Sequence, residues 1–329
     1  MEKIAVIGGG SWATALVKIL SENKAQIWWW LRNPKDVEHL QLYHHNPRYL
    51  SGVNFDLAYV KPTTHLAEAI RDARWIILAV PAAFVQSALS ILPSDVFKGK
   101  VLVSAVKGMI PHQNILITDY LENTFDVPAT HQCIISGPCH AEEVALEKQS
   151  YLTIGSHDLE HAEQFCGLLR NRYVKASPLD DLDGIEYAAV IKNIVALACG
   201  IAHGLGYGDN FQAVMVSNAM QEINRFLHAV MPVPRDLNGS AYLGDLLVTA
   251  YSQFSRNRTF GNMIGRGYTV KSAQFEMNMV AEGYYAVESI HELNRTLKVR
   301  MPIAEAVYRI LYENNSPAAE LEILKEEFK

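Results

Sequence analysis

The N-terminal segment constrains the fold more than any other part of the chain. An apolar stretch at residues 4–7 predicts a strand, a glycine turn follows, and a helix is predicted to begin at Ser11. Gly8, Gly10 and Ala13 form the pattern G-x-G-x-x-A. In such a strand–turn–helix unit the glycines permit a tight turn and let a pyrophosphate approach the backbone, and the helix N-terminus attracts its charge. The segment predicts a dinucleotide-binding Rossmann domain, with a glycine-rich turn of another α/β protein as the alternative.

Short apolar strands alternate with helices through the first half of the chain, which implies right-handed βαβ units and a largely parallel sheet. The predicted strands are 4–7, 25–30, 75–80, 101–105, 133–136 and 151–154. From about Asp180 helical patterns replace them, at 185–201, 210–230, 241–253, 279–297 and 303–313. We predict an α/β fold: a doubly wound NAD(P)-binding domain over residues 1–180, then an all-α substrate-binding and catalytic domain over residues 181–329. The ligand is expected at the carboxyl ends of the strands, facing the helical domain.

Composition excludes several classes of protein. The net charge of −6 argues against nucleic-acid binding. The four cysteines have no C-x-x-C spacing, so we expect no metal site and a reducing compartment. No signal peptide is evident, and no apolar run approaches the ~20 residues that span a bilayer. These features predict a cytoplasmic protein without a membrane span.

The end of the second predicted strand bears on cofactor choice. A NAD-selective Rossmann domain usually has an acidic residue there, which binds the ribose 2′-hydroxyl. This chain has no acid at that point and has Arg32 instead, whose guanidinium could pair with a 2′-phosphate. The sequence therefore favours NADP(H), while NAD(H) use stays open, and a solvated loop arginine is the alternative. The neighbouring tryptophans, Trp28–Trp30, are interpreted as packing residues.

Two further segments follow predicted strands at the same rim of the sheet. Lys107 comes after the strand 101–105, and the segment 136–143, Ser-Gly-Pro-Cys-His-Ala-Glu-Glu, comes after the next one. Side chains at the carboxyl ends of parallel strands point into the ligand crevice. Plain βα loops are the alternative for each.

The second half contains three candidate functional groups. Lys192, followed by Asn193, has apolar neighbours all around its predicted helix, and burial lowers the pKa of an ammonium group into the range of acid–base catalysts. A snorkelling lysine is the alternative. Asp245 and Thr249 lie one helical turn apart, on one face. The triplet Ser255–Asn257 is predicted to be a loop of phosphate donors or, alternatively, an ordinary surface loop.

Taken together, these motifs resemble the bacterial NAD(P)-dependent sn-glycerol-3-phosphate dehydrogenases. The resemblance covers nearly the whole chain in family order. Its segments are GGGSWATAL (8–16), NPRYLSG (46–52), AVPA (79–82), SAVKGM (104–109), SGPCHAEE (136–143), VIKNIVALACGIAHGLGYGDN (190–210), LGDLLVT (243–249), SRNRTFG (255–261) and VAEGYYAV (280–287). It implies reversible, NAD(P)H-dependent reduction of dihydroxyacetone phosphate to sn-glycerol 3-phosphate, a supply of phospholipid backbones, and a homodimer.

The resemblance also implies roles for individual residues. Lys192 corresponds to the acid–base catalyst, and Asn193, Asp245 and Thr249 correspond to residues that surround the reacting carbonyl or order the lysine. The implied cofactor contacts are Gly8, Gly10, Ser11, Trp12, Arg32, Lys107, Ala141, Arg256, Val280 and Glu282. The implied substrate contacts are Lys107, Gly137, Cys139, Lys192, Asp245, Ser255, Arg256 and Asn257.

Departures from the family pattern leave the catalytic groups in place. They are Ala13 for the third glycine, Cys139 for serine, His203 for aspartate, Ser217-Asn218 for Arg-Gly and Ala241-Tyr242 where a glycine is common. Two alternative functions remain: a β-hydroxyacid or 6-phosphogluconate-type dehydrogenase of the same architecture, and a non-catalytic NADPH-binding sensor. The Ser255–Asn257 triplet argues against the first, and a buried catalytic-type lysine argues against the second.

Overall fold

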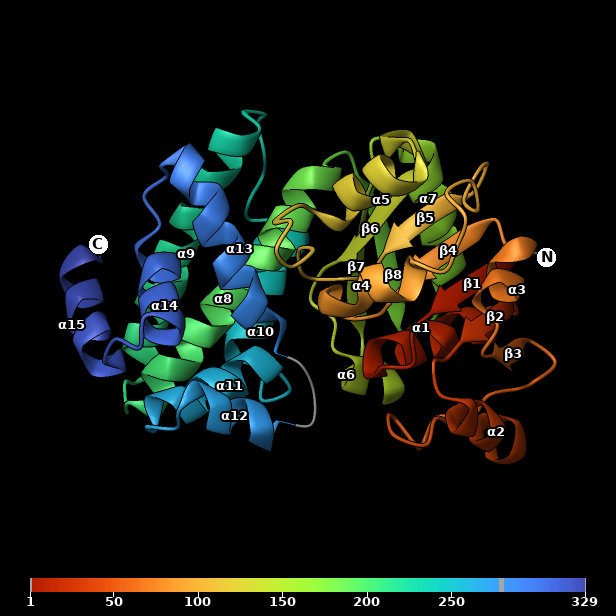
Figure 1. Cartoon of the computed structure of the whole chain (residues 1–329), viewed down its shortest axis with the longest axis horizontal. Helices are drawn as coiled ribbons and strands as arrows, with labels where there is room; N and C mark the ends of the chain where they lie inside the picture. Colours follow the sequence, from red (N-terminus) through yellow and green to blue (C-terminus); the bar gives the residue numbers. More distant parts are fainter. Residues whose placement is uncertain (1, 278–280, 329) are drawn as a thin grey trace. The chain divides into compact units, whose positions relative to one another are not determined.

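The protein is described by a computed structural model, which covers residues 2–277 and 281–328 (Figure 1). The backbone divides into two compact units, each described by itself. Unit 1 comprises Met1–Val106 and Ile117–Asp183, and unit 2 comprises Lys107–Leu116 and Gly184–Lys329. The segment Lys107–Leu116 lies inside the predicted first domain, but it groups with the helical unit.

Unit 1 is built on one sheet with the strand order β3-β2-β1-β4-β5-β6-β7-β8. Its strands are β1 (Lys3–Ile7), β2 (Gln26–Trp30), β3 (Val60–Thr63), β4 (Trp75–Leu78), β5 (Val101–Ser104), β6 (Gln132–Ser136), β7 (Ser150–Gly155) and β8 (Val174–Leu179). Neighbouring strands are parallel except β6 and β7, which are antiparallel. The order around β1 is that of a dinucleotide-binding sheet, and the predicted doubly wound α/β class is confirmed. Strands β3 and β8 are additional to the prediction.

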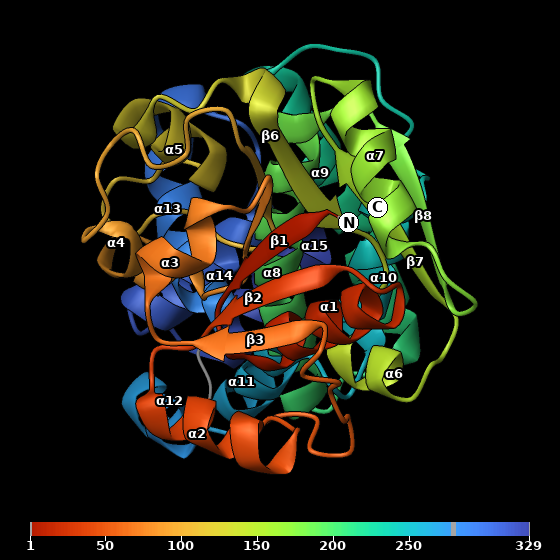
Figure 2. The same cartoon turned by 90° about the vertical axis from the view of Figure 1, so that its right-hand side faces the viewer.

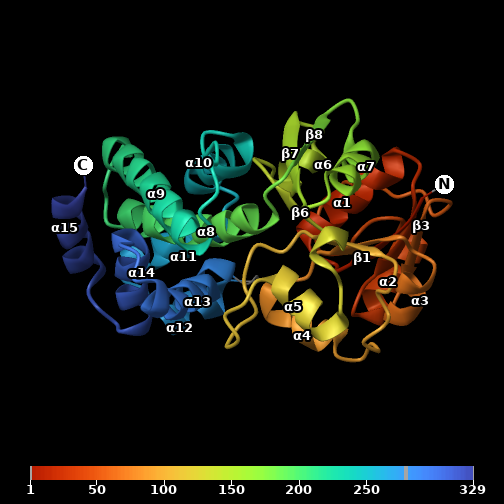
Figure 3. The same ribbon diagram turned by 90° about the horizontal axis from the view of Figure 1, so that it is seen from above.

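Helices cover both faces of this sheet: α1, α6 and α7 lie on one face and α3, α4 and α5 on the other (Figures 2 and 3). The helices of unit 1 are α1 (Ser11–Glu22), α2 (Pro34–Tyr43), α3 (Leu66–Arg71), α4 (Ala82–Leu89), α5 (Ile117–Phe125), α6 (Ala141–Ala145), α7 (Leu159–Leu169) and a short 3₁₀ turn (Ala129–His131). In β1, Ile4 and Val6 pack into a core with Leu16 of α1 and Phe165 of α7. The intervening residue, Ala5, is also fully buried. Burial on both faces explains why the central strands are continuous apolar runs.

Unit 2 is helical, with an isolated bridge between Ile110 and Ile115 as its only β-pairing among the described residues. Its helices are α8 (Leu182–Gly204), α9 (Asp209–Val230), α10 (Asp245–Tyr251), α11 (Arg256–Gly265), α12 (Val270–Glu276), α13 (Glu282–Leu297), α14 (Pro302–Tyr312) and α15 (Pro317–Glu327). The helix predicted at 241–253 is instead a π-helical turn, Ser240–Gly244, followed by α10. The start of the helix predicted at 279–297 falls partly outside the described residues, and α13 begins at Glu282.

Helix α8 is the core of unit 2. By length and composition it could cross a membrane, contrary to our expectation that no apolar run is long enough, but 94% of its most apolar window is buried inside the protein. A core helix has this character because it is apolar on every side. Helix α11 crosses it at backbone contact: a Cβ on Gly200 would lie 2.1 Å from the Arg258 carbonyl oxygen, and one on Gly261 would lie 2.2 Å from that of Leu197. Glycine therefore sets how closely α11 approaches the helix that carries Lys192.

Candidate active site

Lys192 lies in the middle of α8 and is 4% exposed, so the burial that its apolar neighbours predict is confirmed. Its Nζ donates a hydrogen bond to Asp245 Oδ1 and forms an ion pair with that carboxylate. Asp245 is the first residue of α10, directly after the π-helical turn, and it is 1% exposed. The two charges thus form a buried pair between helices far apart in the sequence.

A second lysine approaches the same carboxylate. Lys107 Nζ lies 3.6 Å from Asp245 Oδ2, so Asp245 stands between two ammonium groups. The hydroxyl of Thr249 donates to the backbone oxygen of Asp245 at 2.6 Å, which confirms that these residues share one helical face. Thr249 therefore contacts the first turn of α10 rather than the lysines in this structure.

Electrostatics make Lys192 suited to proton transfer. Burial lowers the pKa of Lys192 from its ordinary 10.5 to about 7, with Asp245 acting to raise it and Lys107 to lower it. A general acid or base works best when its pKa lies near the operating pH. A pKa in this range allows one side chain to donate a proton in one direction of a reaction and accept it in the other.

Asn193 fixes the segment that carries Lys107. Its Nδ2 donates to the Lys107 backbone oxygen at 2.7 Å, and its side chain is buried. Because this segment groups with unit 2, the structure brings together five predicted residues within one compact unit. These are Lys107, Lys192, Asn193, Asp245 and Thr249.

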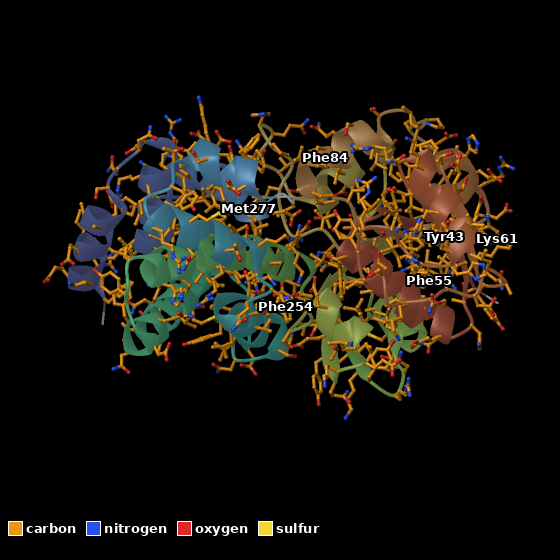
Figure 4. All side chains as sticks on the ribbon, turned by 90° about the horizontal axis from the view of Figure 1, so that it is seen from below. Tyr43, Phe55, Lys61, Phe84, Phe254 and Met277 are labelled. Atoms are coloured by element: carbon orange, nitrogen blue, oxygen red, sulfur yellow. The ribbon has the colours of Figure 1, made fainter. Side chains whose placement is uncertain are left out.

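The sequence suggested that the Ser255–Asn257 triplet is a loop. In the structure the triplet forms the start of α11. Ser255 is the N-cap residue, and its side chain accepts a hydrogen bond from the Arg258 N–H at 3.3 Å. Arg256 and Asn257 follow in the first turn. A helix N-terminus carries partial positive charge, so this placement suits an anion better than a plain loop would. Figure 4 labels Phe254, the residue that directly precedes the cap.

In unit 1, the glycine turn has the shape that the motif predicts. Gly8 has φ +135°, and a Cβ there would lie 2.5 Å from the Ala79 backbone oxygen, whereas a Cβ on Gly10 would meet nothing within 4 Å. Open space beside Gly10 is what a close-approaching pyrophosphate requires. Helix α1 begins at Ser11 with no side-chain cap. The indole Nε1 of Trp12 is a buried donor with no hydrogen-bond partner among the described residues. These features fit a dinucleotide.

Two side chains outside the predicted site residues support this turn. The indole Nε1 of Trp29 donates to the Gly8 backbone oxygen at 2.7 Å, so one tryptophan of the cluster is more than a packing residue. The buried Asn46 donates to the Gly9 oxygen at 3.1 Å and to the Thr14 hydroxyl at 2.9 Å. The sequence offered only the position of Asn46 in a family motif as a signal.

Arg32 follows β2, where the sequence places it. Its guanidinium carbon lies 5.9 Å from the ring centroid of Phe84, a 41% exposed residue of α4 that is labelled in Figure 4. A guanidinium over an aromatic face is held in place by a cation–π interaction. Arg32 is thus an exposed residue whose guanidinium lies near Phe84.

The remaining predicted residues lie at several points in the chain. Gly137 has φ +109°, and a Cβ there would lie 2.6 Å from the Tyr151 backbone oxygen, so this position requires glycine. Cys139 is half-buried, and the buried Ala141 begins α6. Glu282 is the first residue of α13, whereas Val280 lies outside the described residues. No group of three or more His, Cys, Asp or Glu side chains in the described part of the chain could hold a metal ion.

Comparisons with known proteins identify the family. The family model of the NAD-dependent glycerol-3-phosphate dehydrogenase N-terminus matches residues 3–162, and that of the C-terminus matches residues 181–322. The chain belongs to this family. A glycerol-3-phosphate dehydrogenase [NAD(P)+] from Staphylococcus carnosus is 34% identical over 95% of this chain and 94% of the relative. One from an Exiguobacterium species is 35% identical over 98% of this chain and 95% of the relative.

A solved structure agrees with this assignment. The crystal structure of glycerol-3-phosphate dehydrogenase from Coxiella burnetii superposes with a TM-score of 0.92 at 27% sequence identity. The match covers 98% of both chains. The similarity therefore extends over both the sheet unit and the helical unit.

Proposed function

We propose that the chain performs the reaction of its family, the reversible NAD(P)H-dependent reduction of dihydroxyacetone phosphate to sn-glycerol 3-phosphate, with Lys192 as general acid and base. The buried ion pair of Lys192 with Asp245 is the observation that carries the assignment of Lys192. An enzyme needs such a lysine at the reacting oxygen, whereas a protein that only senses NADPH has no use for it. Burial places its pKa where both protonation states are accessible near neutral pH.

In the reduction, Lys192 Nζ donates its proton to the carbonyl oxygen of the substrate as that oxygen gains negative charge. A nicotinamide, when bound, supplies hydride to the carbonyl carbon. Asp245 orients Lys192 and keeps it protonated more often than burial alone would allow. Lys107, beside the same carboxylate, adds positive charge. Stabilising an oxyanion is usually the largest catalytic effect, worth roughly 3–4 kcal/mol per donor.

The phosphate of the substrate is assigned to the N-terminus of α11. Arg256 supplies charge there, and Ser255 and Asn257 supply hydrogen-bonding groups, together with the dipole of the helix. Lys107, Gly137 and Cys139 are further substrate contacts in this proposal. Asn193 acts by holding the Lys107 segment, and Thr249 by bracing the first turn of α10.

The cofactor is assigned chiefly to the glycine turn of unit 1. Gly8, Gly10, Ser11 and Trp12 would hold its pyrophosphate, and Arg32 would face the adenosine ribose, which favours NADP(H) while NAD(H) stays possible. Lys107, Ala141, Arg256, Val280 and Glu282 complete the proposed contacts. Residues 1–180 are accordingly proposed as the NAD(P)-binding domain and 181–329 as the substrate and catalytic domain. A homodimer, a cytoplasmic location and supply of phospholipid backbones complete the proposal.

The test is turnover with purified protein. NADPH and NADH are each offered with dihydroxyacetone phosphate and with a 3-oxo acid, and NADP+ and NAD+ are each offered with 6-phosphogluconate for the oxidative direction. We expect rapid oxidation of the reduced cofactor only with dihydroxyacetone phosphate. Preferred turnover of either other substrate would assign the chain to a different dehydrogenase class. Cofactor binding without turnover of any substrate would indicate a sensor.

A further inference from the structure

Gly283, the second residue of α13, contacts two residues of the proposed site in unit 2, Asn257 and Asn193. Its N–H donates to Asn257 Oδ1 at 2.9 Å. A Cβ on Gly283 would lie 2.7 Å from the Asn193 backbone oxygen and 2.9 Å from Leu197 Cδ1. All these residues are buried. No side chain fits at position 283 unless α13 moves away from α8.

We propose that Gly283 is a positioning residue for the substrate, because its N–H orients the Asn257 amide so that the phosphate meets Nδ2 rather than the oxygen. This inference rests on the proposed function. A phosphate dianion offers only acceptors, so it binds a donor and repels a carbonyl oxygen. The Gly283 N–H is a donor as well, and it can pair only with Oδ1. If the amide were reversed, its Nδ2 would face the Gly283 N–H, donor against donor. Its Oδ1 would face the phosphate, acceptor against acceptor.

The absence of a side chain on Gly283 has a separate effect, on helix packing. It lets α13 rest against the backbone of Asn193, whose side chain holds the Lys107 segment and which directly follows Lys192. A displacement of α13 would therefore disturb the phosphate donor and the residue next to the proton-transfer lysine together. Small misplacements of such groups are costly to catalysis.

Asn257→Asp and Asn257→Ala test the orientation of the amide. Aspartate can still accept from the Gly283 N–H, and a negative charge in the first turn of α11 suits the helix, so this variant should fold. It presents an oxygen where Nδ2 was. We expect selectivity, measured as kcat/KM for dihydroxyacetone phosphate over kcat/KM for dihydroxyacetone, to fall about tenfold or more in the alanine variant and further in the aspartate variant. An aspartate variant as selective as the alanine variant, or more so, would overturn the proposal.

Gly283→Ala tests the glycine itself. Its selectivity should fall about fivefold or more, and little further loss is expected when it is combined with Asn257→Ala, because the phosphate effect acts through that amide. Ile290→Ala is the control: Ile290 is a buried residue further along α13, so its truncation perturbs the packing of that helix without touching the amide. Selectivity should survive in the control, with thermal unfolding reporting stability in each variant.

The outcomes separate this inference from the proposed function. A wild-type protein that does not prefer dihydroxyacetone phosphate over dihydroxyacetone contradicts the proposed function itself. A wild type that prefers dihydroxyacetone phosphate, but whose selectivity is retained in Gly283→Ala or lost equally in Ile290→Ala, contradicts only the role of Gly283. If Gly283→Ala does not fold, the proposal is tested by whether selectivity is lower in Asn257→Asp than in Asn257→Ala.

Discussion

Replacing Asp245 by asparagine should shift the pH dependence of the reaction to lower pH in both directions. Lys192 must be protonated to act as the acid of the reduction and neutral to act as the base of the oxidation. Reduction therefore falls and oxidation rises as pH passes through the pKa of Lys192, which burial lowers to about 7. Asp245 opposes that lowering, and Lys107 adds to it. Asparagine keeps the size of the side chain but removes its charge, so the pKa of Lys192 should fall.

The magnitude follows from the contact. An opposite charge in direct contact shifts a pKa by about 1–3 units. With a pKa of about 7, about half of Lys192 is protonated at neutral pH in the wild type. A fall of that size would leave roughly 10% to 0.1% protonated. The pH profiles of both directions should therefore move down by about 1–3 pH units, while the equilibrium constant keeps the two directions in the same proportion at any given pH.

The assay is kcat and kcat/KM in both directions across the pH range in which the protein stays folded. Asp209→Asn, an exposed charge at the start of α9, is the control for a lost aspartate in the same unit. We expect the profile of Asp245→Asn to move to lower pH and that of Asp209→Asn to stay in place. An equal loss in both directions with an unmoved profile would show that Asp245 acts through geometry alone.

Four further predictions address other groups. Lys192→Ala should lower the turnover number by ~10²–10⁴-fold with NADPH binding unchanged, and a loss below tenfold would remove it from the acid role. Arg256→Ala should raise the KM for dihydroxyacetone phosphate about tenfold or more, with some loss of turnover, and unchanged constants would place the phosphate elsewhere. Arg32→Asp should shift the ratio of catalytic efficiencies from NADPH toward NADH through repulsion of the 2′-phosphate, and a ratio unchanged within about twofold contradicts the cofactor assignment. Burial raises the pKa of Glu222 from 4.5 to about 8, so the stability from its bound proton is lost as pH rises through that window. Glu222→Gln should therefore gain in unfolding free energy relative to wild type as pH rises through this window, and a difference between the two proteins that is the same at every pH in urea unfolding would contradict this.

The sequence predicted the strands that are buried on both faces, because these are continuous apolar runs. It missed β3 and β8, the two edges of the sheet. Each edge strand carries a lysine and a proline, Lys61 and Pro62 in one and Lys175 and Pro178 in the other. Such residues discourage pairing with another chain, and the same residues weaken a strand pattern. The antiparallel pairing of β6 with β7 depends on the path of the connection between them. The spacing of apolar residues within a strand does not indicate that path.

In unit 2, the start of a helix was harder to predict where it depends on a capping residue than where it follows from apolar periodicity. Ser255 is a capping residue in the sequence and in the structure, yet the polar triplet was interpreted as a loop because Arg256 and Asn257 have no apolar periodicity. The π-helical turn before Asp245 leaves no sequence signal either. It is closed by backbone hydrogen bonds, and it ends where the carboxylate begins α10.

The burial of Lys192 could be predicted from its helix alone, but the contacts it makes could not. Asn193 contacts a backbone oxygen 86 residues away, and Asp245 lies 53 residues from Lys192. The grouping of Lys107–Leu116 with unit 2 follows from such contacts. The only sequence signal of Gly283 is its position in a family motif, since its importance comes from the approach of α13 to the Asn193 backbone.

The buried charges of unit 2 are better explained by chemistry than by stability. Removing two charges from water costs several kcal/mol per ion, and well-packed apolar residues often stabilise a protein as well or better. Here two ammonium groups share one carboxylate, because Lys192 contacts Oδ1 and Lys107 lies near Oδ2 of Asp245. Such an arrangement leaves an excess of positive charge whenever both lysines are protonated. In a buried site without a ligand this excess charge lowers stability. It would, however, stabilise a substrate oxygen that becomes negative during the reaction. Lys107 also contributes to lowering the pKa of Lys192, so in the proposed mechanism one cluster sets both the charge around the reacting oxygen and the acidity of the proton donor.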